Sequence, residues 1–220
     1  MKILLNNYEN DLMFEYSCVN SIEMLNKKAF YQLLKDINNL NEQSNISFIE
    51  NGELVNSQSK ISIVYDYVNF DFDNKKIVNG IINLINENIN EKQKNEINKF
   101  YKRLVEEYNK IVGDLDLKLE IQDDFSVENI TKLLKVRLVR KDSLFDNLLL
   151  LIDVENELQL NKLLVFVNLK DYLESSELEE FYKYAIYKEV NLLLLDNNKH
   201  ITSKFEKKLL IDDDLVEFVL

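Results

Sequence analysis

Two continuous apolar runs separated by a helical segment constrain the fold of this chain more than any other feature. The first run, Leu163-Leu-Val-Phe-Val167, is typical of a central parallel strand that is covered on both faces. The second run spans residues 190–195. Between them, Ser176 and Glu179 have the spacing of a capping box that opens a helix. A strand, a helix and a strand at this spacing form a βαβ unit, so the sequence predicts an α/β fold with a mostly parallel sheet.

The N-terminal part of the chain adds further strand signals. Short apolar or alternating runs predict strands over residues 3–5, 12–14, 46–49, 53–55 and 61–66. Apolar positions at helical spacing, among them Phe30, Leu33 and Ile37, predict a helix over residues 22–40. Residues 144–158 are apolar almost all round, which predicts a buried helix.

The middle of the chain looks mainly helical. Asp73 or Asn74 can cap one helix, an Asn-rich stretch breaks it, and a second helix runs to Gly113. Residues 114–122 alternate like a short strand, and Ser126 caps a further helix. The sequence therefore predicts an α/β head domain made of residues 1–66 and 141–220, with a helical domain of residues 67–140 inserted in it.

The sequence lacks residues that several classes of activity require. Glycine occurs only at positions 52, 80 and 113, so no glycine-rich phosphate loop can be written, and no nucleotide is expected. His200 is the only histidine and Cys18 the only cysteine, which argues against a nucleophilic triad and against zinc. We interpret His200 as a solvated loop residue. A lone cysteine and the lack of a long apolar segment predict a cytoplasmic protein with no membrane contact.

The charge pattern is segregated. The formal net charge of −12 argues against nucleic-acid binding when it is taken alone. Yet Lys132, Lys135, Arg137, Arg140 and Lys141 fall within ten residues that contain no acid. This stretch can neutralise phosphates without reading sequence, although a solvated helix end explains it equally well. Weaker candidates of the same kind on the first helix are Lys27 and Lys28.

Acidic residues are concentrated just before the basic stretch. Asp114, Asp116, Glu120 and Asp123 lie close together in the sequence, and carboxylate oxygens suit Ca²⁺ or Mg²⁺. The spacing is not that of an EF-hand loop. The alternative interpretation is the solvent-facing side of an amphipathic strand.

The order of these segments resembles a known family. The stretches Asn161-Lys-Leu-Leu-Val-Phe-Val-Asn168 and Val190-Asn-Leu-Leu-Leu-Leu-Asp196, with the capped helix between them, are similar to the C-terminal part of the small adaptation (spacer-acquisition) protein of type II-A CRISPR–Cas systems, the Csn-two family. In the middle, residues 68–73, 114–120 and 133–139 have counterparts in the same order. The resemblance covers the chain from about residue 22 onward.

The resemblance implies a fold and a function. Members have a head like a P-loop NTPase core that has lost its nucleotide site, with an inserted α-helical leg. Four subunits form a homotetrameric ring that threads onto ends of linear double-stranded DNA without sequence preference and without enzymatic activity. Calcium held by acidic residues stabilises the ring, which acts with the CRISPR integrase proteins and the RNA-guided nuclease. On this chain, the resemblance assigns Ca²⁺ to Asp114, Asp116 and Glu120, and the DNA channel to residues 132–140.

Two alternatives remain open from the sequence. Residues 48–58 contain no lysine where the family is lysine-rich, which leaves room for a protein-interaction scaffold of the adaptation complex that binds little DNA. A metal-dependent nuclease could use Asp114, Asp116 and Glu120, but no lysine or other base stands in register with them.

Overall fold

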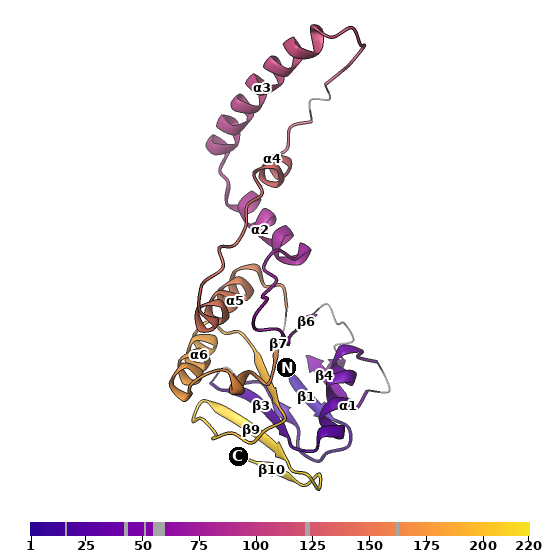
Figure 1. The fold of residues 1–220 in the computed structure, drawn as a ribbon, viewed down its shortest axis with the longest axis vertical. Helices are drawn as coiled ribbons and strands as arrows, with labels where there is room; N and C mark the ends of the chain where they lie inside the picture. The colour runs from indigo at the N-terminus through magenta and orange to yellow at the C-terminus, as the bar shows by residue number, and fades with distance from the viewer. Residues whose placement is uncertain (16, 42–43, 51, 55–59, 122–123, 162) are drawn as a thin grey trace. The chain divides into compact units, whose positions relative to one another are not determined.

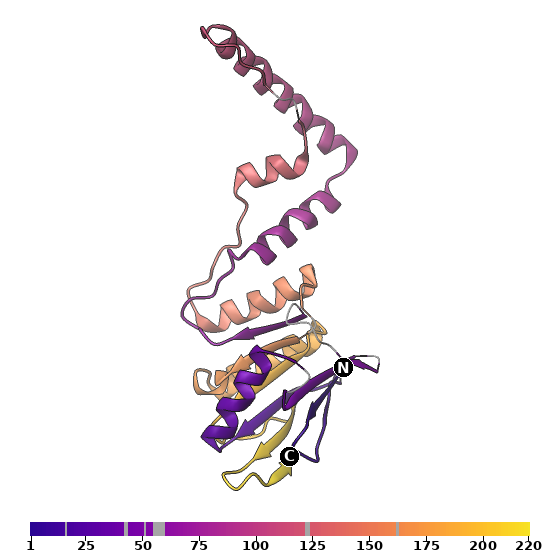
Figure 2. The same cartoon turned by 90° about the vertical axis from the view of Figure 1, so that its right-hand side faces the viewer.

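The fold was analysed in a computed structural model that describes residues 1–220 except 16, 42–43, 51, 55–59, 122–123 and 162. By the proximity of their Cα atoms the residues separate into two compact units. The first contains residues 1–70 and 140–220, and the second contains residues 71–139. Both chain ends lie in the first unit, which we call the α/β unit (Figures 1 and 2).

A six-stranded mixed sheet forms the centre of the α/β unit. Its strand order is β10-β9-β3-β8-β7-β6. The bounds are β3 Val19–Met24, β6 Ile61–Val64, β7 Leu163–Val167, β8 Leu192–Asp196, β9 Glu206–Ile211 and β10 Glu217–Val219. All neighbours pair in parallel except β10, which runs antiparallel to β9. The α/β prediction is therefore confirmed.

The two faces of this sheet carry different layers. On one face lie α1 (Lys27–Asn38) and a four-stranded antiparallel sheet of order β2-β1-β4-β5. The bounds of its strands are β1 Lys2–Leu5, β2 Leu12–Met13, β4 Ile46–Glu50 and β5 Glu53–Leu54. Side chains such as Ile22, Phe30 and Phe48 join these elements in one apolar core. Figure 1 shows α1, β1 and β4 on one side of the sheet and the remaining two helices on the other.

Those two helices, α5 (Leu144–Leu158) and α6 (Ser175–Tyr187), cover the opposite face. Phe166 on β7 meets Phe181 on α6 edge-on, with ring centroids 5.5 Å apart. A short 3₁₀ helix, η2 (Leu169–Asp171), follows β7. Most of the buried charged residues in the described part of the chain lie on this side of the sheet, whereas Asp36 is buried on α1.

The second unit, which we call the helical unit, contains α2 (Lys75–Asn88), α3 (Glu91–Gly113) and α4 (Val127–Leu134). Ile77 and Ile82 of α2 are buried, as is Thr131 of α4, and these two helices contact each other. In contrast, α3 contains no buried residue. None of the helices in the described part of the chain is both long and apolar enough to cross a membrane.

Several local predictions were wrong. The expected helix over residues 22–40 begins only at Lys27, because residues 19–24 form the central strand β3. Residues 114–121 form turns and irregular backbone rather than the predicted strand. The helix α6 starts at Ser175, and Glu177 accepts a hydrogen bond from the Glu174 N–H, so Ser176 and Glu179 are not its capping pair. Strands β9 and β10 were not predicted.

Candidate functional site

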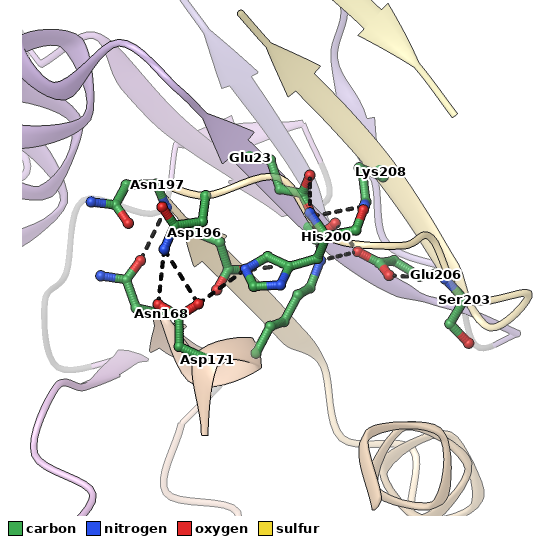
Figure 3. Close-up of polar contacts among 12 residues, drawn as sticks. Glu23, Asn168, Asp171, Asp196, Asn197, His200, Ser203, Glu206 and Lys208 are labelled. Atoms are coloured by element: carbon green, nitrogen blue, oxygen red, sulfur yellow. Dashed lines mark hydrogen bonds and ion pairs between the residues drawn. The ribbon is translucent and has the colours of Figure 1, made fainter. Parts of the chain in front are cut away.

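Five charged side chains meet at one place on the α5–α6 face of the sheet. They come from β3 (Glu23), η2 (Lys170), β8 (Asp196) and β9 (Glu206 and Lys208). Each is at most 7% exposed. We call these five residues the charge cluster; Figure 3 labels Glu23, Asp196, Glu206 and Lys208 of the cluster, together with neighbouring residues such as His200. Charges so far from water persist only when they are paired.

The lysines connect the carboxylates. Lys170 Nζ lies 3.0 Å from Glu23 Oε1 and also contacts Glu206. Lys208 Nζ lies 2.7 Å from the same Glu23 oxygen. Burial alone would raise the pKa of Glu23, but hydrogen bonds from Lys208 and Lys170 outweigh it and lower that pKa. Burial likewise works to lower the pKa of Lys170, but Glu206, Asp196 and Glu23 raise it. Lys170 and Glu23 are therefore stable as an ion pair, with both side chains charged.

Asp196 has the weakest pairing in the charge cluster. It ends β8 and is fully buried, with its carboxylate 3.7 Å from Lys170 Nζ. Neither carboxylate oxygen has a hydrogen-bond partner in good geometry among the described residues. Burial raises the pKa of Asp196 to about 7; Lys170 works against this shift, and Glu23 and Glu206 add to it.

The charge cluster also holds the segment between β8 and β9, residues 197–205, which we call the β8–β9 loop. Glu23 accepts a hydrogen bond from the His200 N–H, and Lys208 donates to the His200 carbonyl. The His200 ring lies 3.4 Å from Asp171 (Figure 3). His200 is therefore half-buried, and its interpretation as a solvated loop residue was wrong.

The connection between β3 and α1 lacks a phosphate cradle. Only Leu25 and Asn26 separate the strand from the helix. The Asn26 side chain accepts hydrogen bonds from the N–H groups of Lys28 and Ala29, at 3.2 and 3.1 Å. A phosphate bound at a helix N-terminus needs those amides free. In this structure the Asn26 side chain occupies both of those amides.

Three of the predicted DNA-binding residues gather in the helical unit. Lys132 lies on α4, and Lys135 follows its end in the left-handed conformation, with φ 52°. Lys132, Lys135 and Arg137 all line one surface hollow of about 330 Å³, together with Asp73. All three are exposed. The described lining of the hollow thus contains three cations and one acid, and Lys132 also forms an ion pair with Glu128 of α4.

The other predicted basic residues belong to the α/β unit. Arg140 and Lys141 are exposed, and the main chain of Lys141 exchanges two hydrogen bonds with the Asn147 side chain of α5. Lys27 and Lys28 are exposed on the first turn of α1.

Three of the four predicted metal ligands lie in or just after the C-terminal end of α3, within the described residues. Asp114 caps the C-terminus of α3, and Asp114, Asp116 and Glu120 are all exposed. Asp123 lies outside the described residues. Across the described ranges, no three histidine, cysteine or acidic side chains come together in a way that could hold a metal ion.

Sequence reasoning missed the charge cluster altogether. Its members are separated widely along the chain: Lys170 and Glu23 are 147 positions apart. A usable signal was present, because Glu23 lies between Ile22 and Met24, and Lys208 precedes Leu209-Leu-Ile211. Charged residues directly beside such apolar positions are expected to be paired when the segment is a central strand.

Comparison with known proteins identifies the chain's relatives at the level of the family. No curated protein sequence matches it. The family described as CRISPR-associated protein (Cas_Csn2) matches residues 39–215, well over half of the 220 residues, and the match spans both units. The sequence resemblance, the α/β sheet and this match agree, and the chain belongs to the Cas_Csn2 family of CRISPR-associated proteins.

Proposed function

We propose that this protein binds ends of double-stranded DNA without sequence preference and without chemistry, as a homotetrameric ring that supports CRISPR spacer acquisition. Membership of the Cas_Csn2 family implies a role in CRISPR adaptation. The observation that carries the DNA-binding part is the convergence of Lys132, Lys135 and Arg137 on one hollow. Its partners in this role are the CRISPR integrase proteins and the RNA-guided nuclease.

The hollow has the properties of a surface that binds the phosphate backbone of DNA. Its cations come from a helix end and the segment after it, and among its described lining residues no side-chain amide is placed to read a base edge. Phosphate contacts of this kind give affinity that ignores sequence and falls with salt. Because the whole chain is acidic, with a net charge of −12, binding depends on this local concentration of positive charge.

Self-association is supported by α3. Ile97, Tyr101, Leu104, Tyr108 and Ile111 recur at alternating spacings of four and three residues, which is the seam of a coiled coil. Leu104, Tyr108 and Ile111 are each more than half exposed in the single chain. A 23-residue helix with such a seam and no buried residue is stabilised by packing against another surface.

In this proposal calcium binds only in the assembled tetramer. Since one chain does not gather Asp114, Asp116 and Glu120 into a cage, ions would bind where another subunit supplies further oxygens. Calcium should then shift the equilibrium toward the tetramer, which analytical ultracentrifugation with Ca²⁺ or with a chelator measures.

The deciding experiment compares linear with closed-circular DNA of the same sequence in a gel-mobility assay, at low and moderate salt. A threading ring shifts the linear form only, and blocking both ends of that DNA with bulky hairpin caps abolishes the shift. If neither DNA is retarded at low salt, the proposal fails, and the protein acts as a scaffold for its protein partners.

The test of the hollow needs variants that keep the fold. Lys132→Gln and Arg137→Gln remove charge from exposed positions. At position 135 asparagine is the better replacement, because it tolerates the left-handed backbone that this residue adopts. Lys183→Gln, which removes one exposed charge from the α/β unit, is the matched control for each single change.

A further inference from the structure

The charge cluster contains an odd number of ionisable groups. Three carboxyl groups, from Glu23, Asp196 and Glu206, face two ammonium groups, from Lys170 and Lys208. All five residues are buried. With every carboxyl ionised the cluster carries one uncompensated negative charge, and a buried uncompensated charge is strongly unfavourable. One carboxyl is therefore better accommodated as the neutral acid.

Asp196 is the carboxyl that fits the neutral form. Glu23 accepts hydrogen bonds from both lysines and from the His200 N–H, and Glu206 accepts from Lys170, from the Ser21 hydroxyl and from the Ser203 N–H. Asp196 is held more weakly, by the longer approach of Lys170 Nζ at 3.7 Å and by the Lys170 backbone N–H. Its pKa of about 7, raised by burial, agrees with the geometry.

The remaining titratable groups around Asp196 supply no compensating charge near neutral pH. Tyr182 of α6 and Tyr67, which follows β6, have pKa values raised mainly by burial, so both stay neutral. Burial also lowers the pKa of His200 in the β8–β9 loop, which is therefore uncharged above its ordinary value of 6.5. A further acid, Asp171 of η2, faces His200 at 3.4 Å.

The same carboxylates that surround Asp196 hold the β8–β9 loop. Glu23 and Glu206 bind the N–H groups of His200 and Ser203, at 3.2 and 3.3 Å. Lys170 connects these two glutamates to Asp196. A charge appearing on Asp196 competes for Lys170 and repels both glutamates, which weakens their hold on the loop.

We propose that ionisation of Asp196 loosens the β8–β9 loop, so that this loop opens more readily at pH 8 than at pH 6. The protonated cluster is neutral and holds the loop closed. The loop carries Ile201, which is 89% exposed, and exposed Lys199 and Lys204, so a change in its order alters the surface that the α/β unit presents. The inference concerns the α/β unit alone and is independent of DNA binding.

Hydrogen–deuterium exchange of the full-length protein tests the proposal. Peptides covering residues 197–205 are followed at pH 6, 7 and 8, with exchange times corrected for the pH dependence of the chemical step. The Asp196 carboxyl has a pKa of about 7 while the loop is closed, and we expect its ordinary pKa when the loop is open. The equilibrium constant for opening then rises about tenfold between pH 6 and pH 8. Peptides from α1 serve as the reference, because global unfolding would change them equally.

The comparison with Asp196→Asn isolates the carboxyl. His200 titrates in the opposite sense and is kept in both proteins, so the difference between them belongs to Asp196. We expect the pH-dependent opening to disappear in D196N and to persist in Asp213→Asn, which removes an exposed acid from the β9–β10 turn. Equal pH dependence in wild type and D196N, or none in wild type, overturns the proposal.

A second measurement covers the case in which D196N does not fold. The carboxyl ¹³C resonance of Asp196 in the wild-type protein, labelled at aspartate, should titrate with its midpoint near neutral pH. A midpoint of about 4 shows that Asp196 is ionised throughout the range and refutes the proposal.

Discussion

Lys170 of η2 and Glu23 of β3 meet at 3.0 Å with both side chains almost completely removed from water, although 147 positions separate them in the chain. The contact joins the segment after β7 to the central strand. Replacing buried ion pairs with apolar residues can be neutral, but removing one partner leaves the other charge unpaired.

Lys170→Met should therefore destabilise the protein strongly. The substitution keeps much of the side-chain volume but leaves Glu23, Glu206 and Asp196 with Lys208 as their only neighbouring ammonium group in the charge cluster. We expect the free energy of unfolding to fall by about 3–5 kcal/mol, measured by urea denaturation. The loss should be smaller at pH 5, where protonation of a carboxyl relieves the excess charge. Lys183→Met, at an exposed pair with Glu179, should change stability by less than about 1 kcal/mol.

Asp196→Asn should make stability less sensitive to pH on the alkaline side. The folded-state pKa of Asp196 is raised to about 7, so the folded protein binds the proton more tightly than the unfolded chain, and stability is lost as pH rises toward 7 and stays low above it. Between pH 6 and 8, the stability of D196N relative to wild type should increase by about 1.4 kcal/mol. Denaturant titrations at the two pH values measure this, and a constant difference between the proteins would contradict it.

Removing the three cations of the hollow should weaken DNA binding without changing its sequence preference. The slope of log K against log salt is negative, and each phosphate that is no longer neutralised reduces its magnitude by about 0.9. The triple change Lys132→Gln, Lys135→Asn, Arg137→Gln should therefore reduce that magnitude by up to about 3. Fluorescence anisotropy with two unrelated DNA sequences over a salt series gives both quantities. An unchanged slope would show that phosphates lie elsewhere, for example near Lys27 and Lys28.

Leu104→Glu should separate self-association from folding. Leu104 is 52% exposed in the single chain, so a charge there costs little in the monomer but disrupts an apolar seam on α3. We expect a lower oligomeric state by light scattering and an unchanged circular dichroism spectrum. Lys102→Gln on the opposite side of α3 changes the net charge by the same amount and should leave assembly intact. Loss of assembly in both variants would indicate a charge effect rather than a seam.

The sequence alone predicts the helices and strands that are specified by their own residues. The apolar runs that became β7 and β8 and the all-apolar helix α5 need no knowledge of their neighbours. Strand β3 was not predicted, because its polar residues Asn20, Ser21 and Glu23 are typical of a solvent-exposed segment, whereas all three are buried. Their burial depends on β8 and β9 lying on either side, which is a property of the sheet order and not of the segment.

The same distinction applies to the candidate sites. Lys132, Lys135 and Arg137 could be found because neighbours in sequence stay neighbours at a helix end. Asp114, Asp116 and Glu120 are also neighbours in sequence, but an exposed segment without a pairing strand does not turn its carboxylates toward one point. The charge cluster is assembled entirely by tertiary structure, so local patterns could only hint at it.

The position of β3 between β8 and β9 has a consequence for how the protein is made. Ile22 pairs with Leu195 on one side and with Leu209 on the other, so the partners of the central strand are synthesised 173 and 187 residues after it. Until then Glu23 has neither Lys170 nor Lys208 beside it, and both edges of the strand are open. Contacts between such distant segments slow folding and prolong the exposure of unpaired edges. Removal of the residues from Leu209 onward takes away half of β9 and all of β10, so nascent or cleaved chains of this kind should be prone to aggregate rather than merely less active.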